Sequence, residues 1–116
     1  MKNILVALLI LLAAKSFSQT LKPEEAKNHI NDTVTVCGKI VATHKIASSG
    51  NVFMDFGKPF PDNIFTVVIF GRDYSKFNAP ENALKNKNVC IKGKVILAND
   101  KPEIILSDTS QLKITK

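Results

Sequence analysis

The residues with the clearest chemistry in this sequence are its two cysteines, Cys37 and Cys90. Two cysteines in a small domain most simply form one disulfide if the protein folds in an oxidising compartment. The C-x-x-C spacing of a redox-active pair is absent, and the chain offers too few further ligands for a metal site. The pair is therefore predicted to be a structural disulfide, provided that the chain is exported and that the fold brings both positions together.

Side chains that could support catalysis are scattered. Neither His29 nor His44 has an evident carboxylate or nucleophile partner in the sequence. Ser48-Ser49-Gly50 is typical of a flexible loop, and Gly57-Lys58-Pro59 lacks the spacing of a phosphate loop. The carboxylates that occur singly, without metal-ligand spacing, are Asp55, Asp73, Glu103 and Asp108. We therefore expect no enzyme activity, no metal and no cofactor, and we expect Glu103 to face solvent.

Binding to a polyanion is the other chemistry that the residues allow. Single-stranded nucleic acid requires cations for its phosphates and aromatic faces on which its bases stack. Phe53 and Phe56 cannot both be assigned by simple alternation, because a bulge is expected near Asp55. The candidate nucleic-acid-binding residues, which are loop cations and outward or edge positions of one strand, are Lys45, Lys58, Thr66, Val68, Phe70, Arg72, Tyr74 and Lys101. Phenylalanines at strand spacing are more often core than base platforms, so these positions rest on a modest signal.

Length and composition limit what can position these residues. The chain has 116 residues, a net charge of +6 and 45% hydrophobic residues, which fits one small domain. Five Gly and five Pro exclude collagen-like and low-complexity chains, and the apolar content argues against disorder. An enzyme with its own cofactor domain is excluded by size.

The N-terminal residues have the pattern of a secretory signal peptide. A basic start at Lys2 precedes the apolar run 4–14, and Ser16-Phe17-Ser18 supplies the small residues of a cleavage site. The run is too short to span a bilayer, which needs about 20 residues. The alternative is a buried N-terminal helix. We expect cleavage after Ser18, which leaves an exported chain without membrane insertion and lowers the net charge from +6 to +4, because Lys2 and Lys15 are removed.

After a short helix predicted in the segment 19–32, the hydrophobic period changes from that of a helix to that of strands. Pro23 suits the first helical position, and Ala26 and Ile30 share a face. The strand patterns of period two or of β-branched composition cover 33–41, 52–56, 64–70, 88–98 and 103–106. One helical turn is expected at 80–84, between the third and fourth strands, with Phe77 and Leu84 packing back on the sheet.

Five short strands with a long interruption after the third have the order of an OB-fold, a five-stranded Greek-key barrel. The predicted fold class is therefore all-β, with the barrel formed by residues 33–116. Gly38 and Gly93 lie on the inward side of the first and fourth strands, as a small, sharply coiled barrel requires. A β-sandwich is the alternative, but it usually needs about seven strands. Cys37 and Cys90 fall on the outward parity of two strands that are neighbours in an OB barrel, which supports the disulfide.

The sequence also resembles a known group, the small exported bacterial OB-fold domains similar to the anticodon-binding OB domains of tRNA synthetases. The resemblance covers about Glu24 to Ile114 and departs at Thr109, where the group has Pro. The segments that carry it are 25–30, 34–40, 53–61, 65–70, 89–95, 102–106 and 107–112. The function that this resemblance implies is binding to nucleic acid.

Two functions remain open at this point. The first is an exported, non-catalytic module that binds single-stranded nucleic acid or another polyanion. The alternative is a periplasmic accessory domain that binds a protein or a small ligand and has no role with nucleic acid. The sequence predicts no oligomeric state.

Overall fold

The computed structural model describes residues 20–115; the predicted signal peptide, residues 1–18, lies outside this range. Within the described residues, no helix has the length and apolar character needed to span a membrane. The strands are β1 (Thr20–Leu21), β2 (Thr33–Lys45), β3 (Val52–Phe56), β4 (Phe65–Ile69), β5 (Asn88–Lys94), β6 (Ile96–Ala98), β7 (Lys101–Ile105) and β8 (Leu112–Ile114). The helices are short: η1 (Pro23–Asn28), η2 (Gly71–Lys76), α2 (Pro80–Ala83) and η3 (Thr109–Gln111).

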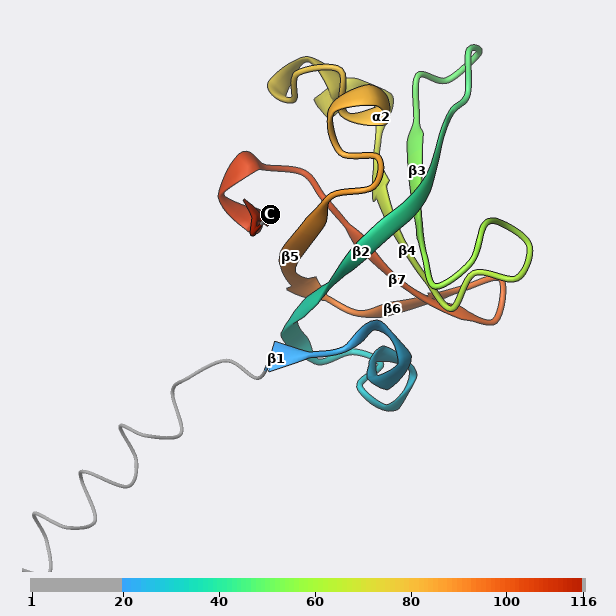
Figure 1. The fold of residues 1–116 in the computed structure, drawn as a ribbon, viewed down its shortest axis with the longest axis vertical. Coiled ribbons are helices and arrows are strands. Elements are labelled where there is room, and N and C mark those ends of the chain that lie inside the picture. Colours follow the sequence, from blue (N-terminus) through green and yellow to red (C-terminus); the bar gives the residue numbers. More distant parts are fainter. Residues whose placement is uncertain (1–19, 116) are drawn as a thin grey trace, which may run out of the picture.

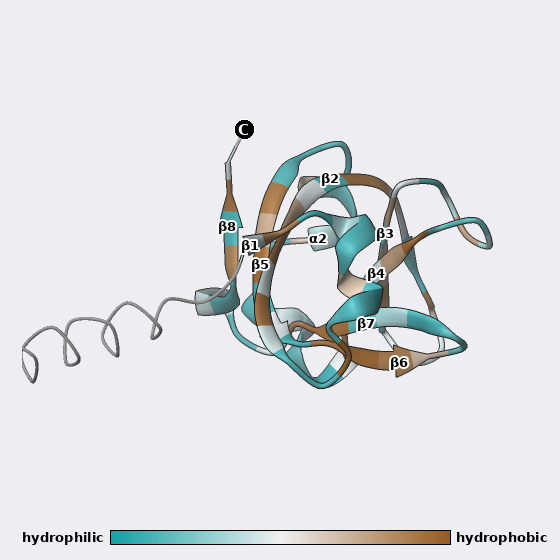
Figure 2. Cartoon of the chain, turned by 90° about the horizontal axis from the view of Figure 1, so that it is seen from below, coloured by the Kyte–Doolittle hydropathy of each residue, from teal (hydrophilic) through white to brown (hydrophobic). Residues whose placement is uncertain are grey.

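The strands form one curled sheet in the order β6-β7-β4-β3-β2-β5-β8, with β1 beside β2. All neighbours in this order are antiparallel except β4 and β7, which are parallel. Figure 1 shows the strongly coiled β2 crossing the molecule, and Figure 2 shows the strands curling around a shared interior. The predicted all-β OB fold is confirmed, and the short helical turn α2 lies where it was expected.

The structure has more strands than the five predicted. The expected strand at 88–98 is divided into β5 and β6, because the chain leaves the β2–β5 ladder at Val95. There the Val95 N–H donates to the Asp32 carbonyl (3.0 Å), and the Asn31 N–H donates to the Val95 carbonyl (2.7 Å). The extra strands β1 and β8 are edge pieces of two and three residues. The predicted N-terminal helix forms as the 3-10 helix η1, with Pro23 in its first position.

The core sits between the inward faces of the strands. Its largest fully buried side chains include Phe56 and Phe65, whose rings lie 5.1 Å apart. Phe77 and Leu84 pack against this core from the segment between β4 and β5, as predicted. Gly38 is needed for close approach, because a Cβ there would lie 2.6 Å from the Pro23 ring of η1.

β2 belongs to two parts of the barrel. Its first half, 33–39, pairs with β5, and its second half, 40–45, pairs with β3. The register shifts between Ile40 and Ala42, opposite Phe56 and Asp55. The bulge expected near Asp55 therefore lies on the facing strand, and β3 alternates regularly.

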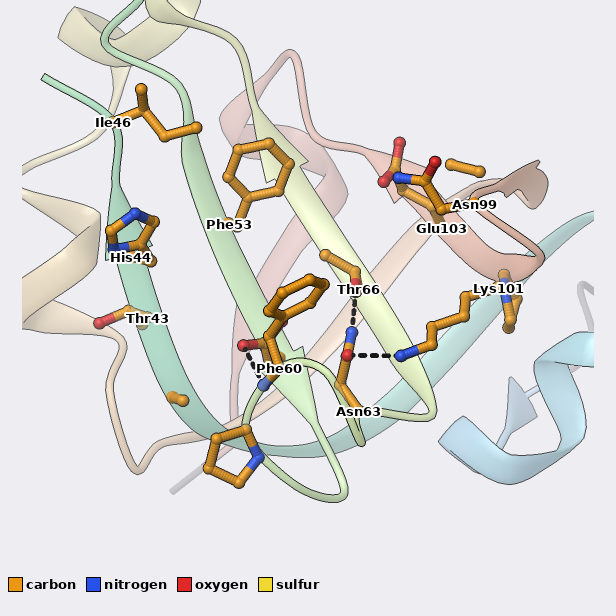
Figure 3. Close-up of a pocket in the computed structure, with 15 residues that line it drawn as sticks. Thr43, His44, Ile46, Phe53, Phe60, Asn63, Thr66, Asn99, Lys101 and Glu103 are labelled. Atoms are coloured by element: carbon orange, nitrogen blue, oxygen red, sulfur yellow. Dashed lines mark hydrogen bonds between the residues drawn. The ribbon is translucent and has the colours of Figure 1, made fainter. Parts of the chain in front are cut away.

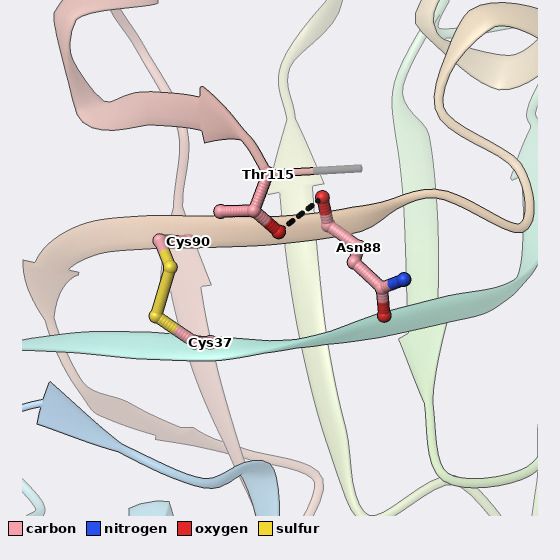
Figure 4. The surroundings of a disulfide bond; sticks show 4 residues. All are labelled: Cys37, Asn88, Cys90 and Thr115. Carbon is pink, nitrogen blue, oxygen red and sulfur yellow. Dashed lines mark hydrogen bonds between the residues drawn. A yellow bond between two sulfur atoms is a disulfide. The ribbon is translucent and has the colours of Figure 1, made fainter.

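A disulfide joins the first half of β2 to β5. Cys37 and Cys90 are directly opposite each other in the antiparallel ladder, and their sulfurs are bonded across it (Figure 4). Beside them, the Thr115 hydroxyl donates to the Asn88 carbonyl (3.0 Å), which fastens the end of the described chain to β5. The outward parity of the two cysteines in the sequence predicts this pairing.

Candidate ligand-binding groove

A groove of about 610 Å³ lies on the outer face of β3, β4 and β7. Its volume is within the range of sites that hold small ligands. In OB folds this face, together with the loops at its ends, is the part that binds oligonucleotides and oligosaccharides. The residues that line it are Ala42, Thr43, His44, Ile46, Phe53, Asp55, Pro59, Phe60, Asn63, Thr66, Ala98, Asn99, Lys101, Pro102 and Glu103 (Figure 3).

The floor of the groove is built by strand register. Asp55 of β3 is paired with Thr66 of β4, and Thr66 is paired with Glu103 of β7. Side chains directly opposite each other in a sheet point to the same face. This transverse row therefore places one carboxylate on each side of a threonine hydroxyl.

Two phenylalanine rings flank the floor. Phe53 is half-buried and lies two residues before Asp55 on β3, so both side chains project from the same face, about 7 Å apart. Phe60 belongs to the loop between β3 and β4 and is 75% exposed. Figure 3 shows both rings along β3 in the groove. Neither ring belongs to the hydrophobic core cluster, so both are available to a ligand.

Asp55 is the most buried charged group in the groove, with 6% of its surface exposed. Its Oδ2 accepts a hydrogen bond from the Phe60 N–H (3.2 Å). Burial raises the pKa of this carboxyl above its ordinary value, and the Phe60 hydrogen bond and the charges of Lys101 and His44 oppose the shift. The site thus holds a desolvated carboxylate beside an aromatic ring.

Glu103 is the second acid of the floor. Burial raises the pKa of its carboxyl, and the described residues supply it with neither a hydrogen bond nor an ion pair. Glu103 points outward, as expected, but its side chain is only partly exposed, because the parallel pairing of β7 with β4 places it in the groove.

A hydrogen-bonded chain closes one end of the groove. The Lys101 ammonium donates to the Pro61 carbonyl and to Asn63 Oδ1 (2.9 Å), and Asn63 Nδ2 donates to Thr66 Oγ1 (2.5 Å). The Lys101 nitrogen also lies 5.7 Å from the centre of the Phe60 ring. These contacts tie the start of β7 to the β3–β4 loop and occupy part of the lysine's donor capacity.

Of the predicted binding residues, the structure brings only Thr66 and Lys101 into the groove. Val68 has the predicted outward parity but is buried, with 2% exposed, and Lys58 is exposed in the β3–β4 loop. The remaining four residues form two pairs outside the groove. The Lys45 nitrogen lies 3.9 Å above the Tyr74 ring, and Arg72 lies 5.4 Å from the centre of the Phe70 ring.

The Tyr74 pair is held by further contacts. The Tyr74 hydroxyl donates to both carboxylate oxygens of Glu81 at 2.8 and 2.9 Å, and the Thr43 hydroxyl donates to the Glu81 carbonyl (2.6 Å). The Tyr74 bonds attach α2 to η2, and the Thr43 bond attaches it to the far end of β2. Tyr74 thus has a structural role in this arrangement.

Sequence reasoning missed the groove residues Phe53, Asp55, Phe60 and Glu103 as a set. The alternation of Val52, Met54 and Phe56 toward the core was the signal that places Phe53 and Asp55 outward. Nothing local in the sequence indicates that β7 carries Glu103 beside them.

The described residues contain no group of three or more His, Cys, Asp or Glu arranged to hold a metal ion. His29 Nδ1 lies 3.2 Å from Asp32 Oδ2, but neither residue lines the groove. His44 lines the groove without a hydrogen bond to Asp55. What the groove offers is two aromatic faces, two acidic acceptors, the Lys101 ammonium at one end, the His44 imidazole and a few neutral polar groups.

No protein-family model matches the sequence, and no curated protein matches it significantly. Several solved structures are similar in fold. A Leishmania major protein described as an aspartyl-tRNA synthetase matches 87% of this chain with 9% identity and a TM-score of 0.55, and the match covers 21% of the synthetase. A chain of yeast Stn1 and Ten1 matches 87% with 13% identity and a TM-score of 0.55, over 64% of that chain.

A third match is the hypothetical protein ygiW of E. coli, with 22% identity and a TM-score of 0.49 over 86% of this chain and 98% of that one. In the first two matches, this chain spans about a fifth of the length of the synthetase and less than two thirds of the length of the yeast chain. At these identities the likeness concerns architecture alone. Together with the strand order, it shows that the chain has an OB fold.

Proposed function

We propose that this protein is a non-catalytic binding module whose groove receives one or two bases of single-stranded nucleic acid. The observation that carries the proposal is the pair of rings that line the groove outside the core, Phe53 from the outer face of β3 and Phe60 from the β3–β4 loop. Aromatic side chains on this face of an OB fold stack with bases, which is worth about 1–3 kcal/mol per base.

The charges of the groove decide how such a strand lies. Asp55 and Glu103 occupy the floor, so phosphates are repelled from it and only bases enter. Phosphates lie at the rim, where Lys101 borders the groove and Lys58 extends from the β3–β4 loop. With so few cations at the rim, the affinity depends only weakly on salt, since each phosphate that a cation neutralises adds about one unit to the slope of log affinity against log salt.

A second candidate function is supported by the same acids. Asp55 and Glu103 beside two aromatic rings also suit an uncharged small ligand or a protein segment that offers hydrogen-bond donors. Such a ligand would bind with no dependence on salt at all. Salt dependence therefore separates the two candidates.

The proposal includes export and binding without chemistry. The N-terminal pattern of residues 1–18 and the disulfide both fit an oxidising compartment. Mass spectrometry of the protein purified from its host should give a chain that begins at Gln19. A mature chain that retains Met1 would contradict export by this route.

The direct test is fluorescence anisotropy with labelled oligonucleotides of about eight residues, within the site size of one OB fold. We expect saturable binding at about 50 mM salt and a shallow fall in affinity as salt is raised. Double-stranded DNA of the same sequence is the control and should bind more weakly, because its bases are not free to stack. Equal binding of both, or no binding, would contradict the proposal.

A further inference from the structure

The acids of the groove floor have unused capacity to accept hydrogen bonds. Asp55 accepts one bond, from the Phe60 N–H, although a carboxylate offers about four lone-pair sites. Glu103 has no partner among residues 20–115. By contrast, Asn63, Thr66 and Lys101 are already bonded to one another. The free groups of the floor are therefore mainly acceptors.

Asp55 is also well fixed in position. It lies inside β3, its backbone is paired on both sides by β2 and β4, and the Phe60 N–H holds its Oδ2. Phe53 stands on the same face two residues away. A base stacked on the Phe53 ring would therefore lie beside this carboxylate, with an edge of its ring system directed toward it.

The four bases differ in what their pairing edge offers to a carboxylate. Guanine has two adjacent donors, N1–H and N2–H, which match the two oxygens of one carboxylate. Adenine and cytosine place an acceptor nitrogen next to their amino group, and thymine or uracil has one donor between two carbonyl oxygens. An ionised carboxylate only accepts hydrogen bonds, so it repels the acceptors of those three bases.

We propose that the groove selects guanine, with the Asp55 carboxylate accepting both N1–H and N2–H of its pairing edge. The inference rests on the proposed function and names the base that this site prefers. Glu103, on the other side of Thr66, adds a second acceptor and excludes phosphate from the floor. Charge-assisted bidentate pairing of this kind is the geometry that gives the largest discrimination between bases.

The test uses the full mature chain and eight-residue oligothymidines that carry one central guanine, adenine or cytosine. The guanine oligonucleotide should bind at least about tenfold more tightly than the others. Two analogues locate the contact. Inosine lacks the N2 amino group and should lose most of the preference, whereas 7-deazaguanine keeps the pairing edge and should bind like guanine.

Asp55→Asn is the matched variant, because its shape is retained while one acceptor oxygen becomes a donor. It should lose the guanine preference, so that the guanine oligonucleotide binds no more tightly than the adenine and cytosine ones, with a circular-dichroism melt to show that it is folded. Equal binding of all three oligonucleotides would overturn the guanine inference and leave the proposed function standing. If the 7-deazaguanine oligonucleotide binds no more tightly than the adenine and cytosine ones, the guanine inference is also overturned. If no oligonucleotide binds, both the guanine inference and the proposed function are overturned.

Discussion

The two halves of β2 build two unlike regions of this barrel. The first half pairs with β5, carries Cys37 of the disulfide, and has the exposed lysines Lys39, Lys92 and Lys94 around it. The second half pairs with β3 and borders the groove, whose floor holds the carboxylates Asp55 and Glu103. We refer to these as the disulfide side and the groove side.

The comparison shows that net charge is a poor guide to the binding surface of this protein. Several of the lysines that make the chain basic lie exposed on the disulfide side, on the interior strands β2 and β5. The groove side has aromatic rings and acceptors instead. Stability is therefore expected to depend mainly on one side and ligand binding on the other.

The largest expected effect concerns the disulfide side. Cys37→Ser with Cys90→Ser removes a crosslink with a sequence separation of 53 residues. The chain-entropy model assigns it about 4 kcal/mol, and the melting temperature should fall by roughly 15–30 °C. Thermal unfolding by circular dichroism measures this. Unchanged stability, or two free thiols in the unreduced protein, would contradict the structural role.

The next effect concerns the groove side. Phe53→Ala should weaken binding of single-stranded oligonucleotides by about tenfold or more, because it removes one stacking face. Its melting temperature should change by only a few degrees, since Phe53 is outside the core cluster. Phe70→Ala is the matched control, as Phe70 directly follows β4 and does not line the groove. Equal losses of affinity in both variants would contradict the assignment of the site.

A smaller effect is expected for the lysine at the groove rim. Lys101→Met removes a cation near Phe60 and the bond to Asn63 Oδ1. Affinity should fall about threefold, and the slope of log affinity against log salt should decrease by about one if the lysine contacts a phosphate. Lys92→Met with Lys94→Met, on the disulfide side, should change neither quantity. A larger effect of the double variant would reverse the comparison between the two sides.

The smallest effect is a pH dependence of stability from Glu103. Burial raises the pKa of this carboxyl in the folded protein above its ordinary value of 4.5, so the folded chain binds a proton that the unfolded chain has released. Its contribution to stability is present at low pH and is lost as pH rises through the raised pKa. Glu103→Gln should therefore raise the melting temperature by about 1–3 °C at pH 7 and by less near pH 4.

Glu24→Gln, at an exposed position of η1, is the control for this pH series and should show no such difference. A destabilising effect of Glu103→Gln at pH 7 would mean that the ionised carboxylate has a stabilising partner.

Local patterns in the sequence were enough to predict the disulfide side and much of the barrel. The alternation in 33–41 and 88–94 predicts the strands β2 and β5. The shared outward parity of Cys37 and Cys90 predicts that the two cysteines pair. The alternation in 64–70 correctly turns Phe65, Val67 and Ile69 inward. The break at Val95 was not predictable, because it depends on hydrogen bonds to Asn31 and Asp32 far back in the chain.

The groove could be predicted only in part, because it too depends on contacts between residues far apart in the chain. Thr66 and Lys101 were among the expected residues and do line it. Of the other predicted cations, Lys45 lies on Tyr74 through a tertiary contact, Arg72 lies near Phe70, and Lys58 is exposed in the β3–β4 loop. Glu103 enters the groove through the parallel pairing of β7 with β4, which no short-range pattern encodes.

We expect the ligand to bind on the groove side and not on the more basic disulfide side. The most direct test of this expectation is a titration of ¹⁵N-labelled mature protein with a guanine-containing octanucleotide, followed through the backbone amide resonances. We expect the largest shifts at Phe53, Asp55, Phe60 and Thr66, with little change at Lys39, Lys92 and Lys94. Shifts concentrated at those three lysines, with the groove unchanged, would contradict this expectation.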